Sequence, residues 1–192
     1  MVQRLCRILA MQAATVTRRA ALTELRQAAR ALDAARRRAS SPFAMSCALT
    51  ALARACRGLH DEVNAEGYLD EALRWARAAG SIDLVVDLLC ELCEVCAAQG
   101  LATCEDDEGL DPAACERMRD HAFEASTLAN RVADGSWEAH VLMRIGAVLE
   151  SCGDRDDAVL LQTRAVRLMS GSLAGGAPDP ALLPSLGRLA DS

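Results

Sequence analysis

Three cysteines recur at intervals of three residues, at Cys90, Cys93 and Cys96, and Cys104 follows. Thiolates at such spacings can close on one zinc ion or iron–sulfur cluster when the backbone between them is a loop. Here the surrounding residues form an apolar run typical of a buried helix. Because a helix turns about 100° per residue, Cys90 and Cys96 would lie about 120° apart around its axis. We therefore expect small hydrophobic core residues, no metal and no other cofactor.

The remaining candidates for catalysis or ligand binding do not converge on one site. The histidines, His60, His121 and His140, fall in separate segments without a partner at catalytic spacing. The Gly- and Ser-rich stretch at 170–176 lacks the lysine of a phosphate-binding loop, because the chain contains no lysine. The acidic residues 105–108 lack the alternating ligands of a calcium loop and indicate a solvated loop. We expect no enzymatic activity.

The charge of −6 is unevenly distributed along the chain. Residues 1–40 carry nine arginines against Glu24 and Asp33, whereas the remainder carries 12 arginines against 25 acids. Blocks of opposite sign either attract each other within one molecule or mark separate partners, and the sequence leaves both readings open. Nucleic-acid binding is disfavoured because the body is acidic and no aromatic residues interleave with the arginines.

Nine cysteines, an odd number, favour a reducing compartment over a disulfide-bonded framework. Arg4 and Arg7 interrupt the apolar start, and no uncharged run is long enough to cross a membrane. We therefore expect a cytoplasmic protein with no membrane contact, and the excess of alanine and arginine over lysine suggests a bacterial source.

The composition and the apolar periodicity predict helices throughout. Amphipathic spacing marks Thr17–Arg38, and Ser40, Ser41 and Pro42 end that helix. Further helices are expected at about 43–64, 69–79, 84–98, 112–133 and across 137–169. Gly67 is expected to form the turn of the first pair, Gly100 to end the fourth helix, and residues 103–111 to form an acidic insertion. A flexible connector, 171–180, would lead to a weak terminal helix, 181–190.

The last helix pair carries a spaced signature of large apolar, small, turn and alanine positions. Its members are Leu142, Ile145, Gly146, Leu149, Gly153, Ala158 and Ala165. This pattern resembles the tetratricopeptide repeat, although Leu142 and Gln162 stand where aromatic residues are common. Sliding it back selects Cys56, Leu59, His60, Val63, Gly67, Ala72 and Ala79 in the first pair. The middle pair supplies Leu89, Leu92, Cys93, Cys96 and Gly100, with Ala122 and Ala129 displaced by the insertion.

The resemblance implies an all-α, right-handed array of antiparallel helix hairpins, a TPR-like α-solenoid. Its hairpins would be 43–79, 82–133 and 137–170, with residues 1–40 and 171–192 at the two ends as an amphipathic cap and as a linker with the terminal helix.

In this family the first helix of each pair lines a concave groove that holds a peptide or helix. Carried over to this chain, the groove positions are Arg54, Arg57, Asp61, Asn64, Asp87, Cys90, Glu91, Glu94, His140, Met143, Arg144 and Glu150. The resemblance also implies that Cys93 and Cys96 are core positions. A groove with an acidic middle would suit a basic or amphipathic segment.

Two hypotheses of function follow. The first is a non-enzymatic protein–protein interaction module, an adaptor, scaffold or regulatory domain, whose groove binds a partner protein. Reversing Glu91 and Glu94 to arginine should then abolish binding with little loss of helicity. A variant of this hypothesis docks the basic helix in the groove of a neighbouring copy, which makes a homodimer. In the second, the arginine-rich helix binds nucleic acid or an acidic partner under control of the repeat body.

Overall fold

The computed structural model describes residues 2–38, 40–102, 111–132 and 134–174. Those residues form seven α-helices and contain no strand, so the protein is all-α as expected. None of the helices in these ranges combines the length and the apolar character that crossing a membrane requires. The chain divides into two compact units, Met1–Ala79 and Gly80–Ser192.

The first unit contains α1 (Val2–Arg37), α2 (Pro42–Arg57) and α3 (Glu62–Ala79). The start of α2 is set by Ser41, whose hydroxyl accepts a hydrogen bond from the Ala44 amide at 3.3 Å. Pro42 occupies the first helical position, where its missing amide costs no hydrogen bond. The predicted break between the first two helices is confirmed, whereas α1 begins fifteen residues earlier than Thr17.

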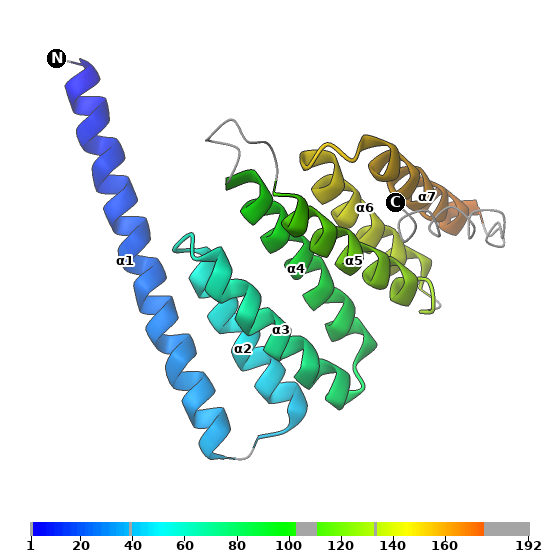
Figure 1. The fold of residues 1–192 in the computed structure, drawn as a ribbon, viewed down its shortest axis with the longest axis horizontal. Helices are drawn as coiled ribbons and strands as arrows, with labels where there is room; N and C mark the ends of the chain where they lie inside the picture. Colours follow the sequence, from blue (N-terminus) through cyan, green and yellow to red (C-terminus); the bar gives the residue numbers. More distant parts are fainter. Residues whose placement is uncertain (1, 39, 103–110, 133, 175–192) are drawn as a thin grey trace. The chain divides into compact units, whose positions relative to one another are not determined.

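Packing in the first unit uses small side chains. Ala21, Ala28 and Leu32 are the buried apolar residues of the C-terminal half of α1, which packs against α2 (Figure 1). Between α2 and α3, the buried hydroxyl of Ser46 donates to the carbonyl oxygen of Ala72 at 2.9 Å. Such a bond requires close helices, because a side chain as short as serine reaches the opposite backbone only at short separation.

The predicted turn at Gly67 is wrong. Gly67 lies inside α3, and the chain turns instead at residues 58–61, between α2 and α3. His60 takes the left-handed conformation there, with φ 60°, and Asp61 accepts a hydrogen bond from the Asn64 amide at 3.3 Å. Val63, which was expected in the apolar stripe, is 75% exposed. The chain turns before Asp61 because this aspartate caps the N-terminus of α3, whereas Gly67 occupies an exposed helix position that tolerates a glycine.

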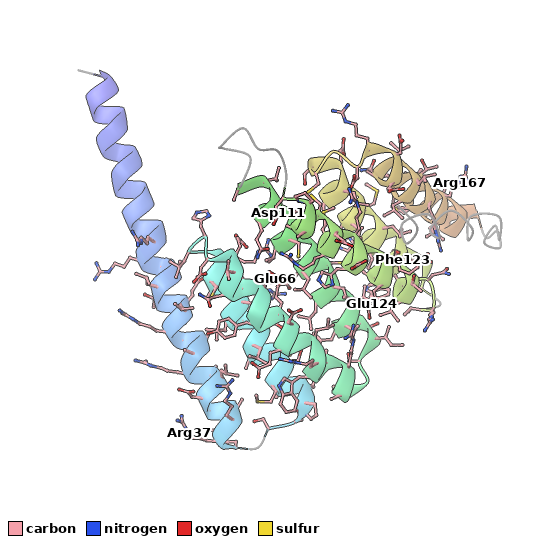
Figure 2. The ribbon with its side chains drawn as sticks, in the orientation of Figure 1. Arg37, Glu66, Asp111, Phe123, Glu124 and Arg167 are labelled. Carbon is pink, nitrogen blue, oxygen red and sulfur yellow. The ribbon has the colours of Figure 1, made fainter. Side chains whose placement is uncertain are left out.

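The second unit contains α4 (Ile82–Ala102), α5 (Pro112–Ala129), α6 (Gly135–Ser151) and α7 (Arg155–Ala174). Aspartates cap two of these helices: Asp111 accepts from the Ala113 amide, and Asp134 accepts from the amides of Ser136 and Trp137. The Asp111–Pro112 start predicted for α5 is therefore confirmed, and Figure 2 shows Asp111 at the beginning of this helix.

In the second unit, α4 pairs with α5, α6 pairs with α7, and α6 also packs against α4 and α5 (Figure 1). The predicted apolar run forms the core of α4, where Leu88, Leu89, Leu92 and Val95 are almost completely buried. Gly100 does not end α4, which continues to Ala102, and α7 extends into the predicted connector as far as Ala174. The acidic residues 103–110 and the predicted terminal helix 181–190 lie outside the described residues.

The helix pairs α2–α3 and α6–α7 correspond residue by residue at one constant offset in sequence number, which we call their constant register. Residue 42 corresponds to 135 and residue 62 to 155, so the helices begin 93 positions apart in both cases. The same difference matches the capping residues Ser41 and Asp134, and it matches His60 with Gly153, whose φ is 88°.

This register corrects the repeat positions of the first pair. The residues that correspond to the signature of the last pair are Leu49, Leu52, Ala53, Cys56, His60, Ala65 and Ala72. All of them except the turn residue His60 are buried. Each lies seven residues before the position that the sequence pattern selected. A shift of seven keeps an apolar stripe on the same side of a helix, so periodicity alone does not distinguish the two registers.

Candidate functional site

Glu94 of α4 and Arg144 of α6 form an ion pair across the second unit. Arg144 Nε donates to Glu94 Oε1 at 2.6 Å, and about a quarter to a third of each side chain stays exposed, 25% and 30%. The two residues are 50 positions apart in sequence. Both were selected from sequence as groove residues, and the structure brings them into contact.

Other residues selected from sequence surround this ion pair. On α4, Asp87 is exposed two turns before Glu94; on α6, His140 and Met143 are exposed within the turn before Arg144. We define the α4–α6 face as Asp87, Glu94, His140, Met143 and Arg144; Glu91, also selected from sequence, is buried beneath it. The face contains two carboxylates and one guanidinium, and it is therefore acidic on balance.

The electrostatics of this face are concentrated around Arg144. Burial by itself lowers the pKa of the Arg144 guanidinium. The hydrogen bond that it donates to Glu94 and the nearby negative groups together raise the pKa by more, so the net pKa lies above the usual value. Glu91 is among those groups and is 3% exposed. Arg144 is therefore a fixed positive charge beside two carboxylates.

The cysteines of α4 do not provide a reactive group. Cys90 is 1% exposed, and burial raises its pKa to about 12, with a smaller increase from neighbouring carboxylates and an opposing decrease from Arg144. Burial likewise raises the pKa of Cys93, whose thiol donates to the carbonyl oxygen of Met118 at 3.5 Å. The expectation of core thiols is confirmed for Cys90, Cys93 and Cys96, which are all buried. Cys90 therefore lies beneath the α4–α6 face instead of on it.

The charge reversal expected to test the groove needs a correction. Glu91 is buried and Glu94 holds Arg144, so arginine at both positions would place like charges beside a half-buried guanidinium. Loss of binding would then reflect loss of folding. Asp87 is the better position, because it is exposed.

In the first unit, the selected residues do not share one helix. Arg54 and Arg57 lie on α2, but Asp61 lies in the turn and Asn64 lies on α3, where its side-chain amide donates to Asp61 at 2.7 Å. The constant register places Cys47 of α2 at the position of His140, and Cys47 is exposed. Cys47 was not selected from sequence. The match between the Ser41–Pro42 start of α2 and the Asp134–Gly135 start of α6 was the sequence signal that could have matched Cys47 to His140.

Other polar contacts of the second unit hold the helices together. Glu150, also a selected residue, is exposed on α6 and accepts from Gln162 of α7 at 3.4 Å. Arg119 of α5 donates twice to Asp154, at 2.9 and 3.0 Å, and so ties α5 to the turn between α6 and α7. Arg164 of α7 donates to Glu138 at 2.5 Å and to Asn130 at 2.7 Å. Among the side chains that the structure describes, no three of His, Cys, Asp or Glu gather as metal ligands do.

Comparisons with known proteins give a likeness to solved structures. No family model and no curated protein matches the chain. Among solved structures, the chain is similar to BtubC (BKLC) from P. vanneervenii, with a TM-score of 0.52 and 20% sequence identity. The match covers 71% of this chain and 51% of BtubC, so the chain spans about half the length of that protein. At this identity the likeness is one of helical fold.

Proposed function

We propose that the protein is a non-enzymatic interaction module, a TPR-like array of helix pairs that binds a segment of another protein. The support is the constant register between the pairs α2–α3 and α6–α7, together with a glycine at the close approach of α6 and α7. Repeated pairs that bury small residues between their helices are the building units of such arrays, and these arrays commonly act by presenting helix surfaces to partners.

The α4–α6 face is the proposed binding surface, and the ion pair between Glu94 and Arg144 carries this assignment. It fixes the two helices at the centre of the face and places a carboxylate and a guanidinium in one defined geometry. Met143, which is 39% exposed, adds a flexible apolar contact beside it. A partner helix could therefore bury apolar side chains on Met143 while its cations approach Asp87 and Glu94.

The partner that this chemistry favours is a basic amphipathic helix. Acidic surfaces raise the association rate of cationic partners and disfavour acidic ones, and helix grooves select apolar residues at helical spacing. The proposed setting is the bacterial cytoplasm: the odd number of cysteines supports a reducing compartment, and the excess of alanine and arginine over lysine supports a bacterial source.

A fluorescently labelled amphipathic helical peptide, with leucine on one face and arginine on the other, tests this proposal; fluorescence anisotropy measures its binding. We call it the arginine–leucine peptide. We expect Asp87→Arg and Met143→Ala to weaken its binding about tenfold each, and a rise in salt to weaken it further. Asp120→Arg, an equal charge change at an exposed position of α5, is the control and should leave the affinity unchanged. Equal affinity for all four proteins would refute the assignment of this face.

A second candidate function rests on the exposed side of α1. Arg19, Arg26, Arg30 and Arg37 are all exposed and lie within about 20° of one line along the helix, opposite the buried side chains Ala21, Ala28 and Leu32. Figure 2 shows Arg37 at the C-terminal end of this row. A straight row of guanidinium groups suits a polyanion, either nucleic acid or an acidic protein.

Binding of a 20-base-pair DNA duplex across a salt series tests the second candidate. If the row neutralises phosphates, the logarithm of the binding constant should fall steeply with the logarithm of the salt concentration. Arg26→Gln together with Arg30→Gln should then reduce the slope by about two. Absence of binding at low salt would leave the arginine row as a solvated surface.

A further inference from the structure

The first helix, α1, is more than twice as long as its packing partner α2. The helix has 36 residues, roughly 54 Å, whereas its packing partner α2 has 16, roughly 24 Å. The side chains of this helix are described from Arg18 onward, and among them Ala21, Ala28 and Leu32 are buried. Figure 1 shows the N-terminal half running on beyond α2 and α3. We call residues 2–17 the N-terminal arm.

The sequence of this arm matches the partner that the α4–α6 face favours. It contains Arg4 and Arg7 and no acidic residue, together with apolar residues such as Leu5, Ile8 and Leu9. An isolated helix of about 15 residues is only marginally stable in water, so a helical arm gains stability when a surface covers it. The α4–α6 face provides charge of the opposite sign through the exposed carboxylate of Asp87 and the partly exposed carboxylate of Glu94, which is paired with Arg144.

We infer that the N-terminal arm of one copy docks on the α4–α6 face of a second copy, which makes a reciprocal homodimer. This inference rests on the proposed function, because it names the occupant of the same face. Each copy carries one arm and one face, so a two-fold arrangement forms both contacts at once and then closes. The second contact is intramolecular once the first has formed, which makes two modest contacts sufficient for a stable dimer.

A charge exchange between two full-length variants tests the inference by sedimentation velocity at 150 mM salt. Arg4→Glu with Arg7→Glu reverses the arm, and Asp87→Arg reverses the face. Each variant alone should be monomeric, whereas the wild-type chain should be a dimer. In an equimolar mixture, the reversed arm meets the reversed face and the native arm meets the native face, so a heterodimer should form.

Arg26→Glu with Arg30→Glu is the matched control, because it makes the same charge change on the same helix outside the arm and should leave the dimer intact. Circular dichroism at 222 nm checks that every variant is folded. A wild-type monomer at 100 µM, dimers in all variants, or a mixture that stays monomeric would each overturn the inference.

Anisotropy with two labelled peptides separates this failure from failure of the proposed function. The receiving protein is the full-length Arg4→Glu, Arg7→Glu variant, whose own arm is reversed. Binding of residues 1–17 as a peptide supports the inference. Binding of the arginine–leucine peptide without binding of the 1–17 peptide overturns it but keeps the face as a protein-binding site, and binding of neither removes both proposals.

Discussion

Gly146 of α6 lies so close to α7 that a Cβ atom on it would stand 2.9 Å from Cγ of Gln162. The carbonyl oxygen of Ala158 would be 3.3 Å away, so both a side chain and a backbone atom limit the space. In the first pair, Ala53 occupies the corresponding position and is completely buried. Small residues at these two positions allow the two helices of each pair to approach closely.

Replacing Gly146 by valine should lower the free energy of unfolding by about 2 kcal/mol, because the added atoms overpack the contact with α7. Urea unfolding followed by circular dichroism measures the change. Gly67→Ala is the control: Gly67 is helical, and a Cβ atom added to it would meet no neighbouring atom within 4 Å, so alanine should raise the stability by about 1 kcal/mol. Two substitutions with the same effect would contradict the close approach at Gly146.

The ion pair between Arg164 and Glu138 is largely buried, with 12% and 7% of the side chains exposed. Glu138→Gln leaves the guanidinium charged without its counter-ion, and we expect a loss of about 3 kcal/mol in urea unfolding. The pair between Arg36 and Glu71 is longer, 3.6 Å, and more exposed. Glu71→Gln should therefore cost less than about 1 kcal/mol, and equal losses at the two sites would refute the role of burial.

Alkaline pH should destabilise the second unit through Cys90. Its pKa is about 12 in the folded protein against 9.0 for an exposed thiol, so between these values the unfolded chain binds fewer protons. The contribution to stability is complete below pH 9 and is lost as the pH rises toward 12. In urea unfolding at about pH 9–11, Cys90→Ala should reduce the downward slope by roughly 1.4 kcal/mol per pH unit. An unchanged slope would place the titrating group elsewhere.

The turns of the two corresponding pairs should respond in opposite directions to substitution. Gly153 has φ 88°, so Gly153→Ala places a Cβ in a disfavoured region and should cost about 1–2 kcal/mol. His60 already accepts a similar strain at φ 60°, so His60→Gly should be neutral or stabilising by up to about 1 kcal/mol. Thermal melts of both variants test this, and a loss at His60 as large as that at Gly153 would contradict the correspondence of the turns.

The sequence predicted the helical class, the start of α5 at Asp111–Pro112 and the buried character of α4, because local signals control each of these. Capping residues act on amides two or three positions away, and an apolar run is buried in any fold that the chain adopts. Glu94 and Arg144 were selected as candidates by the spacing of the repeat pattern, which fits the last pair in the register that the structure has.

Only the tertiary structure decided the register of the first pair, and which charged residues are exposed, buried or ion-paired. Apolar stripes repeat about every seven residues, so Cys56–Ala79 and Leu49–Ala72 fit the pattern nearly equally well, and the turn at His60 selects the second set. Likewise, no periodicity distinguishes exposed Asp87 from buried Glu91. Burial and ion pairing depend on residues 50 positions away in sequence, which only the packing of α6 against α4 brings together.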